Sequence, residues 1–593
     1  MDGWSAARAA AVTLTGPCPR LPDFAFGTWF TWWHAYSEAE AKDDIAHWES
    51  LKLPLDVWAL DMNWRSIANH TDRYYDHPNT TLFPNFTEWF TFLKSKRLRT
   101  YFNDHPFPVA SRNAGGLQTS PEETAFRWQG LSEWMSRGLT FWWFDHNWGF
   151  SIPPPFVNTS ITSGVWDGLD NAAWGSHIYY ESVSAYDRLR KAAGDMWYGG
   201  RPITLTKFGL PDPRASTAAT AWAESPAQHR FPVWWTGDGV DLATSVHTMV
   251  DAGVHDLKPY VHSDCGGDYR GSAGDLLRWT AHCAFGTILR FHGDNHRPWS
   301  YDDHTTGVIR NYLHTRYSLL PTILAGGAEA SASGFPIAAR CDLFWPTLPS
   351  SRARDQYIWL NDTLVAPISD SAHNLTSRNV WIPPGEWHDA WNGTVVRGPR
   401  SMSVTQPYER IPLWHRAGGL LVLAHDGAMR TDEQDWSTLT VEAFPHSNPL
   451  EPHIVDEPRT TRRTLVERAS GDGGREGRTV LTMRTTHPPA LPGPASKPVA
   501  STAVSIQIGA GGVSRAWLLR IHLRRGQRPA ACTIDGAPAK FRLVAPTMVE
   551  AASEAFWPFG GRGSAPAPLA GVIVEIDVSG DAHRSRAVEV QVM

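Results

Sequence analysis

Cysteine is scarce in this sequence. The five cysteines are an odd number, and no two of them have the spacing of metal ligands: Cys18, Cys265, Cys283, Cys341 and Cys532. Disulfide-stabilised domains and structural zinc sites have dense or closely paired cysteines. The sequence therefore predicts neither a disulfide framework nor a zinc site, and we expect no metal ion and no other cofactor.

Long apolar runs and basic blocks are also missing. No stretch of 18 apolar residues occurs, so we expect no membrane-spanning helix. Acidic and basic residues are mixed along the chain, and the formal net charge is −6. This pattern argues against nucleic acid or a membrane surface as a partner. The first 20 residues lack the basic and apolar regions of a clear signal peptide.

One pattern nevertheless points to the secretory pathway or the cell exterior. Seven Asn-x-Ser/Thr sequences occur, at Asn69, Asn79, Asn85, Asn158, Asn361, Asn374 and Asn392. Such sequences are the acceptors of N-glycosylation in secreted proteins. They favour that location although no clear signal peptide is present.

Tryptophan is in excess, with 30 residues, and several occur in pairs such as Trp32-Trp33, Trp142-Trp143 and Trp234-Trp235. Aromatic faces bury large areas, and they also stack on the apolar faces of ligands such as sugar rings. An aromatic core and a carbohydrate site are both consistent with these pairs. The carboxylates that follow two of the pairs favour a site.

The rhythm of residues 23–330 predicts a parallel β/α barrel. Short apolar segments alternate there with longer amphipathic ones, such as Ser37–Leu51, Thr87–Lys96 and Pro121–Arg137. The strand candidates are Phe26–Phe30, Asp56–Leu60, Arg99–Phe102, Thr140–Phe144, Ile203–Phe208, Val233–Thr236, Leu257–His262 and Gly286–Phe291. Eight such units in about 300 residues have the size of a TIM barrel. The predicted fold class is therefore α/β, a (β/α)8 barrel.

After residue 330 the pattern changes to short strands separated by turn residues. Strands are predicted at Tyr357–Leu360, Leu364–Pro367, Asn379–Ile382, Leu420–Leu423, Leu439–Phe444, Val480–Thr485, Val504–Ile508, Ala516–Leu523 and Gly571–Val578. Pro383-Pro384-Gly385 and Asn392-Gly393 predict turns. We expect an N-terminal extension at residues 1–22, the barrel at 23–330, and two all-β (β-sandwich) domains, a proximal one at 331–425 and a distal one at 426–593.

Carboxylates follow several of the predicted barrel strands, next to aromatic residues: Asp61, Asp145, Asp238 and Asp264. The active sites of TIM barrels lie at this end of the strands. A single aspartate after a strand is usually a turn residue or a helix N-cap, and Gly239–Leu242 could open a helix that Asp238 caps. Acidic residues at the same rim position on strand after strand favour an active site.

A metal site is the competing explanation for this rim, because hard cations bind carboxylates. No His-Glu-x-x-His motif or paired-histidine spacing occurs, and aromatic neighbours suit a sugar ring better. Hydrolysis of a glycosidic bond needs two carboxyl groups that flank it, about 5 Å apart in the retaining mechanism. Two carboxylates on nearby strands of one barrel rim can meet that distance.

The motifs resemble those of glycoside hydrolase family 31. The most specific match is residues 230–238, Arg-Phe-Pro-Val-Trp-Trp-Thr-Gly-Asp, which is similar to the family's Arg-Tyr/Phe-x-x-x-Trp-Ser/Thr-Gly-Asp segment. Residues 54–61 resemble the family's second strand, residues 264–267 its Asp-Ile-Gly-Gly, and residues 290–299 its Arg-x-His…Pro-Trp stretch. The resemblance covers the barrel and, more loosely, the β domains after it.

This resemblance implies a role for each matching residue. Asp145 is expected to be the nucleophile and Asp238 the general acid/base. Asp61 and His292 are expected to bind hydroxyl groups of the sugar that is released. The remaining substrate-binding residues that we expect are Arg230, Trp235, Asp264 and Trp143.

Three segments depart from the family pattern. The nucleophile segment reads Asp145-His146-Asn147-Trp148 where the family usually has Asp-Met-Asn-Glu. Thr206-Lys207 replaces Arg-Ser, and Ala-Gln-His-Arg at residues 227–230 replaces Gly-Ser-Gln-Arg. The first barrel strand begins near residue 23, so the β-sandwich that precedes the barrel in the family is expected to be missing. Both catalytic aspartates are kept, and the sugar specificity stays open.

The sequence thus predicts a retaining, exo-acting α-glycoside hydrolase that acts on a glycoside or oligosaccharide. An α-glucosidase is the first expectation, and an α-galactosidase or α-xylosidase is the alternative within the family. A non-catalytic carbohydrate-binding protein on the same fold is the alternative from another class. Retention of both Asp145 and Asp238 favours the enzyme, because a pure binder needs no nucleophile. The sequence predicts no oligomeric state.

Overall fold

The computed structural model describes residues 2–66, 75–104, 121–145, 183–206, 229, 233–267, 271–293, 297–369, 376–424, 427–446, 460–468, 476–486, 502–508, 515–523, 529–544, 572–580 and 585–592. The chain divides into two compact units. The first unit is Met1–Leu313 with Glu329–Ala338 and Met429–Asp432. The second is His314–Ala328, Ala339–Ala428 and Glu433–Met593. The domain bounds that we expect from the sequence stay a prediction.

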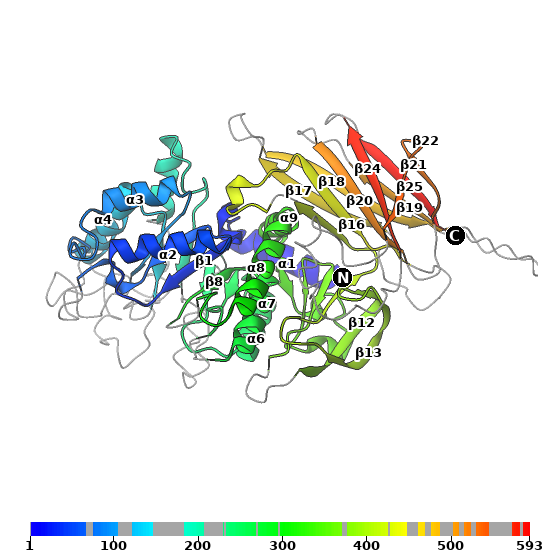
Figure 1. The fold of residues 1–593 in the computed structure, drawn as a ribbon, viewed down its shortest axis with the longest axis horizontal. Coiled ribbons are helices and arrows are strands. Elements are labelled where there is room, and N and C mark those ends of the chain that lie inside the picture. Colours follow the sequence, from blue (N-terminus) through cyan, green and yellow to red (C-terminus); the bar gives the residue numbers. More distant parts are fainter. Residues whose placement is uncertain are drawn as a thin grey trace, which may run out of the picture. The chain divides into compact units, whose positions relative to one another are not determined.

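The first unit contains a parallel eight-stranded sheet, in which every strand candidate from the sequence has a counterpart. The strands are β1 (Thr28–Trp32), β2 (Val57–Leu60), β3 (Tyr101–Asp104), β4 (Phe141–Phe144), β5 (Thr204–Thr206), β6 (Val233–Trp235), β7 (Val261–His262) and β8 (Leu289–Phe291). Their order is β7-β6-β5-β4-β3-β2-β1-β8. In Figure 1, β1 in blue and β8 in green mark the two strands that pair in parallel although they lie far apart in the sequence.

A backbone bridge just beyond β7 joins the two ends of this sheet. Cys265 pairs in parallel with Phe291 of β8, and its N–H donates to the carbonyl of Arg290 over 2.8 Å. The eight strands therefore form a closed ring, which confirms the predicted barrel. The strand residues are almost all buried, as expected for parallel strands that are covered on both faces.

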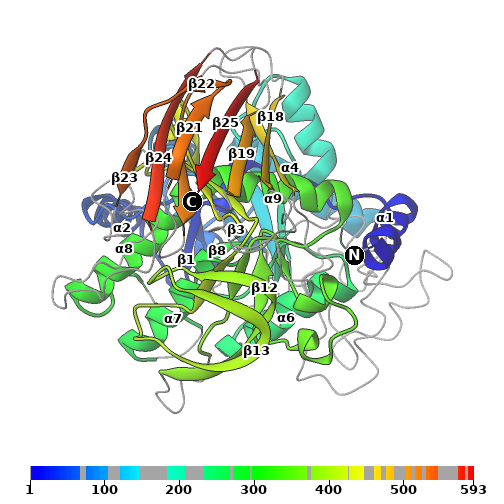
Figure 2. The same cartoon turned by 90° about the vertical axis from the view of Figure 1, so that its right-hand side faces the viewer.

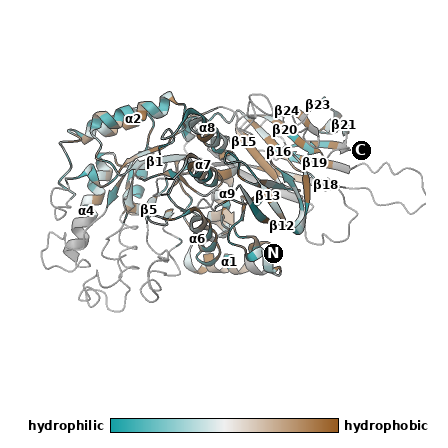
Figure 3. Cartoon of the chain, turned by 60° about the horizontal axis from the view of Figure 1, so that its bottom comes forward, coloured by the Kyte–Doolittle hydropathy of each residue, from teal (hydrophilic) through white to brown (hydrophobic). Residues whose placement is uncertain are grey.

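Helices alternate with the barrel strands along the chain, and several begin at side chains that cap them. The described helices up to residue 333 are α1 (Asp2–Thr15), α2 (Glu38–Ser50), α3 (Phe86–Ser95), α4 (Pro121–Arg137), α6 (Leu242–His255), α7 (Ala273–Ala284), α8 (Asp303–Ser318) and α9 (Leu320–Ser333), with short 3-10 helices at Asp23–Phe26 and Met62–Trp64. Ser37 and Glu40 form a capping box on α2. Figure 3 shows α2 largely in the colour of hydrophilic residues, while Ile45 and Trp48 are buried.

The second unit is built mainly of strands. One sheet has the order β13-β12-β14-β11-β10-β9. Its strands are β9 (Ala338–Ala339), β10 (Tyr357–Trp359), β11 (Thr363–Val365), β12 (Ser377–Asp389), β13 (Val395–Thr405) and β14 (Leu413–Arg416), and short 3-10 helices lie at Cys341–Leu343 and Pro349–Arg352. A further 3-10 helix, Thr431–Glu433, begins in the first unit.

Two further sheets follow, with the orders β15-β16-β20-β24-β23 and β17-β18-β19-β25-β21-β22. Their strands are β15 (Leu420–Ala424), β16 (Thr438–Ala443), β17 (Thr460–Arg468), β18 (Glu476–Thr486), β19 (Thr502–Ile508), β20 (Arg515–Leu523), β21 (Pro529–Ile534), β22 (Ala537–Pro538), β23 (Arg542–Val544), β24 (Val572–Gly580) and β25 (Arg586–Val592). Figure 2 shows strands of both sheets running in nearly the same direction, as in an aligned sandwich.

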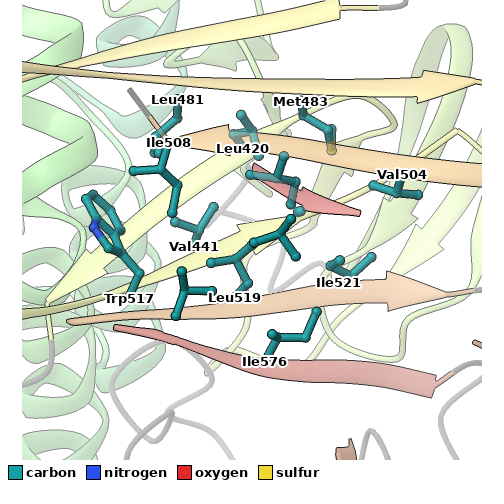
Figure 4. Packing of buried hydrophobic residues seen from close by; sticks show 14 of the residues in the cluster. Leu420, Val441, Leu481, Met483, Val504, Ile508, Trp517, Leu519, Ile521 and Ile576 are labelled. Atoms are coloured by element: carbon teal, nitrogen blue, oxygen red, sulfur yellow. The ribbon is translucent and has the colours of Figure 1, made fainter. Parts of the chain in front are cut away.

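The core of this sandwich is mainly aliphatic, with Trp517 and Met483 among its side chains. In Figure 4, Val441, Leu519 and Ile576 of one sheet face Leu481 and Ile508 of the other. These side chains come from alternate positions along their strands, because successive residues of a strand point to opposite faces. The all-β architecture that we predicted after the barrel is therefore confirmed.

The structure corrects two expectations. Pro383-Pro384-Gly385 does not form a turn between strands, because β12 runs through it and pairs with β13 on both sides of a register shift between Ile382 and Gly385. Proline has no N–H for a sheet hydrogen bond, so a bulge accommodates the two prolines. The sequence also predicts no disulfide framework, whereas the structure has a disulfide between Cys265 and Cys283. Their 18-residue separation has no sequence signature, and the fold brings them together.

Candidate active site

The carboxylates predicted from the sequence meet at one rim of the barrel. Asp61 follows β2, Asp145 follows β4, and Asp264 lies just beyond β7. All three side chains are buried, and Asp238, beyond β6, is partly exposed. They share this rim because the C-terminal ends of parallel strands lie at the same side of a barrel.

The side chain of Asn103 at the end of β3 joins two of these carboxylates. Its Nδ2 donates to Oδ1 of Asp61 over 2.6 Å and to Oδ2 of Asp145 over 2.7 Å. One amide nitrogen carries two hydrogens, so it can donate to both carboxylates at once. Asn103 was not among the predicted site residues. Its place at the end of a barrel strand was the available signal, but a single asparagine there is also a common turn residue.

The carboxyl group of Asp61 is easier to protonate than an ordinary aspartate. Burial, and then the neighbouring charge of Asp145, raise its pKa from 3.8 to about 7. The N–H of Met62 and the amide of Asn103 both donate to Oδ1 and oppose that rise. Asp61 therefore titrates in the neutral range, because desolvation outweighs its hydrogen bonds.

His292 beyond β8 is a neutral hydrogen-bond acceptor in this site. Burial, and then the charge of Arg290, lower its pKa well below the usual value. Nδ1 lies 3.2 Å from the carbonyl oxygen of Thr31, which can only accept, so Nδ1 carries the proton. Nε2 is then an acceptor, 3.8 Å from Oδ2 of Asp61. The ring stands edge-on to Trp143, with centroids 5.1 Å apart.

Arg290 of β8 is the buried cation beneath the rim. Its Nη1 lies 2.5 Å from Oδ1 of Asp264, and its Nε donates to the hydroxyl of Tyr101 over 2.8 Å. The guanidinium lies over the rings of Trp143, at 4.2 Å, and Trp235, at 5.5 Å. The two tryptophans are fully buried and meet edge to face at 5.0 Å. Trp143 thus contacts both Arg290 and His292, Trp235 contacts Arg290, and direct contact of either ring with a substrate stays a prediction.

Asp238 does not cap the helix that follows it. The N-cap of α6 is Asp241, whose Oδ1 accepts the N–H of Thr244 over 2.8 Å. The structural alternative for Asp238 is therefore wrong. Asp238 instead lies near Asp264 and His292. One potential metal-ligand atom of each side chain, a carboxylate oxygen or a ring nitrogen, lies within 4.8 Å of the other two. Such a set could also hold a divalent cation, which is the competing explanation for the rim.

Not every strand-end aspartate belongs to this group. Asp104 ends β3, but its Oδ1 pairs with Arg65 over 3.3 Å and its Oδ2 accepts the hydroxyl of Tyr75 over 2.7 Å. These contacts give Asp104 a structural role. Arg230 and the residues after Asp145, His146-Asn147-Trp148, lie outside the described residues.

Two family models match parts of this chain. The model of the glycosyl hydrolase family 31 TIM-barrel domain matches residues 117–325, and that of the family 31 C-terminal domain matches residues 337–421. This chain belongs to glycoside hydrolase family 31.

Individual relatives are distant. An α-xylosidase of Saccharolobus solfataricus is 24% identical over 476 residues, which cover 73% of this chain and 60% of that protein. Alpha-glucosidase 2 of Bacillus thermoamyloliquefaciens is 22% identical over 460 residues, which cover 69% of this chain and 54% of that protein. This chain thus spans less than two thirds of the length of either relative.

Solved structures share the fold. A family 31 dextranase of Flavobacterium johnsoniae gives a TM-score of 0.72 at 18% identity, and the match covers 100% of this chain and 73% of that one. Among the described helices, none has both the length and the apolar character needed to cross a bilayer.

The raised pKa of Asp61 predicts how its replacement changes the pH dependence of stability. A carboxyl whose pKa rises from 3.8 to about 7 on folding binds its proton more tightly in the folded protein. Its contribution to stability is therefore lost as the pH rises through that window. Asp61→Asn keeps an acceptor oxygen but has no charge to bury. We expect the variant to gain stability over the wild type between about pH 4 and 8, by on the order of 4 kcal/mol for a shift of this size.

Urea unfolding of both proteins at intervals of about one pH unit measures this difference through its linkage to proton binding. Parallel stability curves for the two proteins would contradict the raised pKa.

Proposed function

We propose that this protein is a retaining, exo-acting α-glycoside hydrolase. It cleaves a terminal α-linked sugar from a glycoside or oligosaccharide by way of a covalent glycosyl-enzyme. The observation that carries the proposal is the chain of contacts along one barrel rim. Asp145 is linked through Asn103 to Asp61, Asp61 faces His292, and His292 lies beside Asp238.

In this proposal Asp145 is the nucleophile. Its carboxylate attacks the anomeric carbon, and the departing oxygen takes a proton from the carboxyl group of Asp238. Asp238 then accepts a proton from water, which attacks the glycosyl-enzyme and releases the sugar with its original configuration. The hydrogen bond from Asn103 to Oδ2 fixes the rotation of the Asp145 carboxylate before the substrate arrives.

The surrounding residues suit the binding of sugar hydroxyls. The unprotonated Nε2 of His292 can accept a hydroxyl hydrogen, and the carboxyl groups of Asp61 and Asp264 can accept others. A neutral His292 also adds no positive charge beside an oxocarbenium-like transition state. Arg230 would supply a donor, as the resemblance to the family implies. Trp143 and Trp235 would exclude water from the bottom of the pocket.

The names of the relatives guide the proposal for which sugar is released. An α-glucosidase is the first choice and an α-xylosidase the second, because the relatives carry those names. An α-galactosidase is the remaining option within the family. A panel of aryl α-glycosides separates the three, since only the glycone differs between them. If the protein cleaves none of these glycosides, the alternative of a non-catalytic carbohydrate-binding protein is favoured.

Replacing Asp145 tests its role as nucleophile. Asp145→Ala should lower kcat by about a thousandfold or more, because the covalent step has no other nucleophile. Azide should partly restore cleavage of an activated aryl glycoside and give the β-glycosyl azide, with inverted configuration. The measurement is turnover with product analysis by NMR, after circular dichroism has shown that the variant is folded. Ordinary activity in this variant would rule out Asp145.

Replacing Asp238 tests general acid/base catalysis through the leaving group. Asp238→Ala should slow cleavage of a disaccharide by about 10²–10⁴-fold, because an alcohol leaves only with a proton. Glycosylation by an α-glycosyl fluoride needs little protonation and should be spared. Azide should then speed the second step and give the α-glycosyl azide.

Asp241→Ala is the matched control for this experiment, because Asp241 caps α6 three residues away. It should cost about 1 kcal/mol of stability and leave the chemistry intact. Equal losses on disaccharide and fluoride in Asp238→Ala, without an azide effect, would remove Asp238 from this role. Loss of wild-type activity on dialysis against EDTA would favour the metal site instead.

A further inference from the structure

The bond between Cys265 and Cys283 lies beside a residue of the proposed sugar pocket. Cys265 directly follows Asp264, and Cys283 lies in the last turn of α7. Both cysteines are buried. The disulfide therefore ties the segment that carries Asp264 to the helix behind it.

Two contacts hold the same segment to β8. The N–H of Cys265 donates to the carbonyl of Arg290 over 2.8 Å, and the side chain of Arg290 pairs with Asp264 over 2.5 Å. Asp264 thus stands between an ion pair on one side and a covalent bond, one residue away, on the other. One oxygen of its carboxylate lies within 4.8 Å of a carboxylate oxygen of Asp238 and of a ring nitrogen of His292.

The turn that follows Cys265 contains two glycines in the left-handed region. Gly266 and Gly267 adopt φ values of 103° and 64°, which only glycine reaches readily. A Cβ added at Gly267 would lie 3.4 Å from the ring of Trp279, so α7 packs closely against this turn. Without the disulfide, Asp264 would keep its ion pair, and Cys265 its backbone bridge, but the segment that carries them would lose its covalent link to α7.

We propose that the Cys265–Cys283 disulfide is a positioning element that holds Asp264 in the sugar pocket, so that the affinity of the site for sugar depends on this bond. The inference rests on the proposed function. Reduction by a dithiol would convert the bond to two thiols, while the dithiol becomes a cyclic disulfide. Loss of this covalent link would let Asp264 shift relative to Asp238 and His292.

The first arm of the test locates the bond. The protein is denatured without reductant, alkylated with iodoacetamide and digested. Mass spectrometry should find the peptides of Cys265 and Cys283 linked and the other cysteines, Cys18, Cys341 and Cys532, alkylated. Alkylation of all five cysteines would overturn the proposal.

The second arm measures sugar affinity in Cys283→Ser, well below its melting temperature. The probes are the aryl α-glycoside that the wild type cleaves fastest and the corresponding free monosaccharide as a competitive inhibitor. KM and the inhibition constant should each rise by about tenfold, the size of one weakened charged hydrogen bond, with a smaller change in kcat. A crosslink that only stabilises the fold would lower the melting temperature and leave both constants unchanged, which would overturn the proposal.

Cys341→Ser is the matched control, because Cys341 is a buried cysteine that is not disulfide-bonded. It should keep wild-type constants. Dithiothreitol should raise the inhibition constant of the wild type and of Cys341→Ser, but not that of Cys283→Ser. If Cys283→Ser does not fold, the wild type is treated with dithiothreitol and the inhibition constant is followed over time. Circular dichroism checks that the reduced protein stays folded. The inhibition constant should rise on reduction and return on reoxidation, and an unchanged constant would overturn the proposal. If the oxidised wild type cleaves no α-glycoside, the proposed function fails separately, and the inference is tested by calorimetric titration with monosaccharides.

Discussion

Asp61 and Asp145 are two buried carboxylates that share the side-chain amide of Asn103. Buried acids repel each other, and each needs hydrogen-bond donors in place of water. Here one amide donates to both and fixes their orientation, while burial and the charge of Asp145 raise the pKa of Asp61 to about 7. The barrel makes this possible by ending β2, β3 and β4 at the same rim. The proposed reaction depends on this arrangement, because Asp145 must be held in place while it stays reactive.

The cation of Arg290 and the neutral ring of His292 complete the electrostatics of the rim. Arg290 pairs with Asp264 and lies over the buried rings of Trp143 and Trp235. The same cation, together with burial, keeps His292 unprotonated. In the proposed reaction, the positive charge of Arg290 is offset by Asp264, and the acceptor atoms of His292 and Asp61 would receive the hydroxyl groups of the sugar. This distribution suits a reaction whose transition state carries positive charge on the sugar.

Sequence periodicity was sufficient for the barrel strands and for the carboxylates that end them, because buried parallel strands are short apolar runs with polar residues at their ends. It was not sufficient where the outcome depended on tertiary contacts. Asn103 joins the two carboxylates only because the fold places Asp61 and Asp145 on either side of it. Cys265 reaches Cys283 only because the segment after β7 packs against α7. Gly239–Leu242 suggested a cap by Asp238, whereas α6 begins later, at Asp241. The prolines at 383 and 384 favour a turn, but β12 continues through them by way of a bulge.

The central claim is that Asp145 forms a covalent bond to the sugar. A fluorinated α-glycosyl fluoride tests it most directly, because the ring fluorine slows both steps while the good leaving group keeps the first step fast enough to trap the intermediate. Peptide mass spectrometry of the trapped protein should place one glycosyl group on the peptide that contains Asp145, and none in Asp145→Ala. A glycosyl group on another residue, or turnover with inverted configuration and no trapped intermediate, would contradict the account.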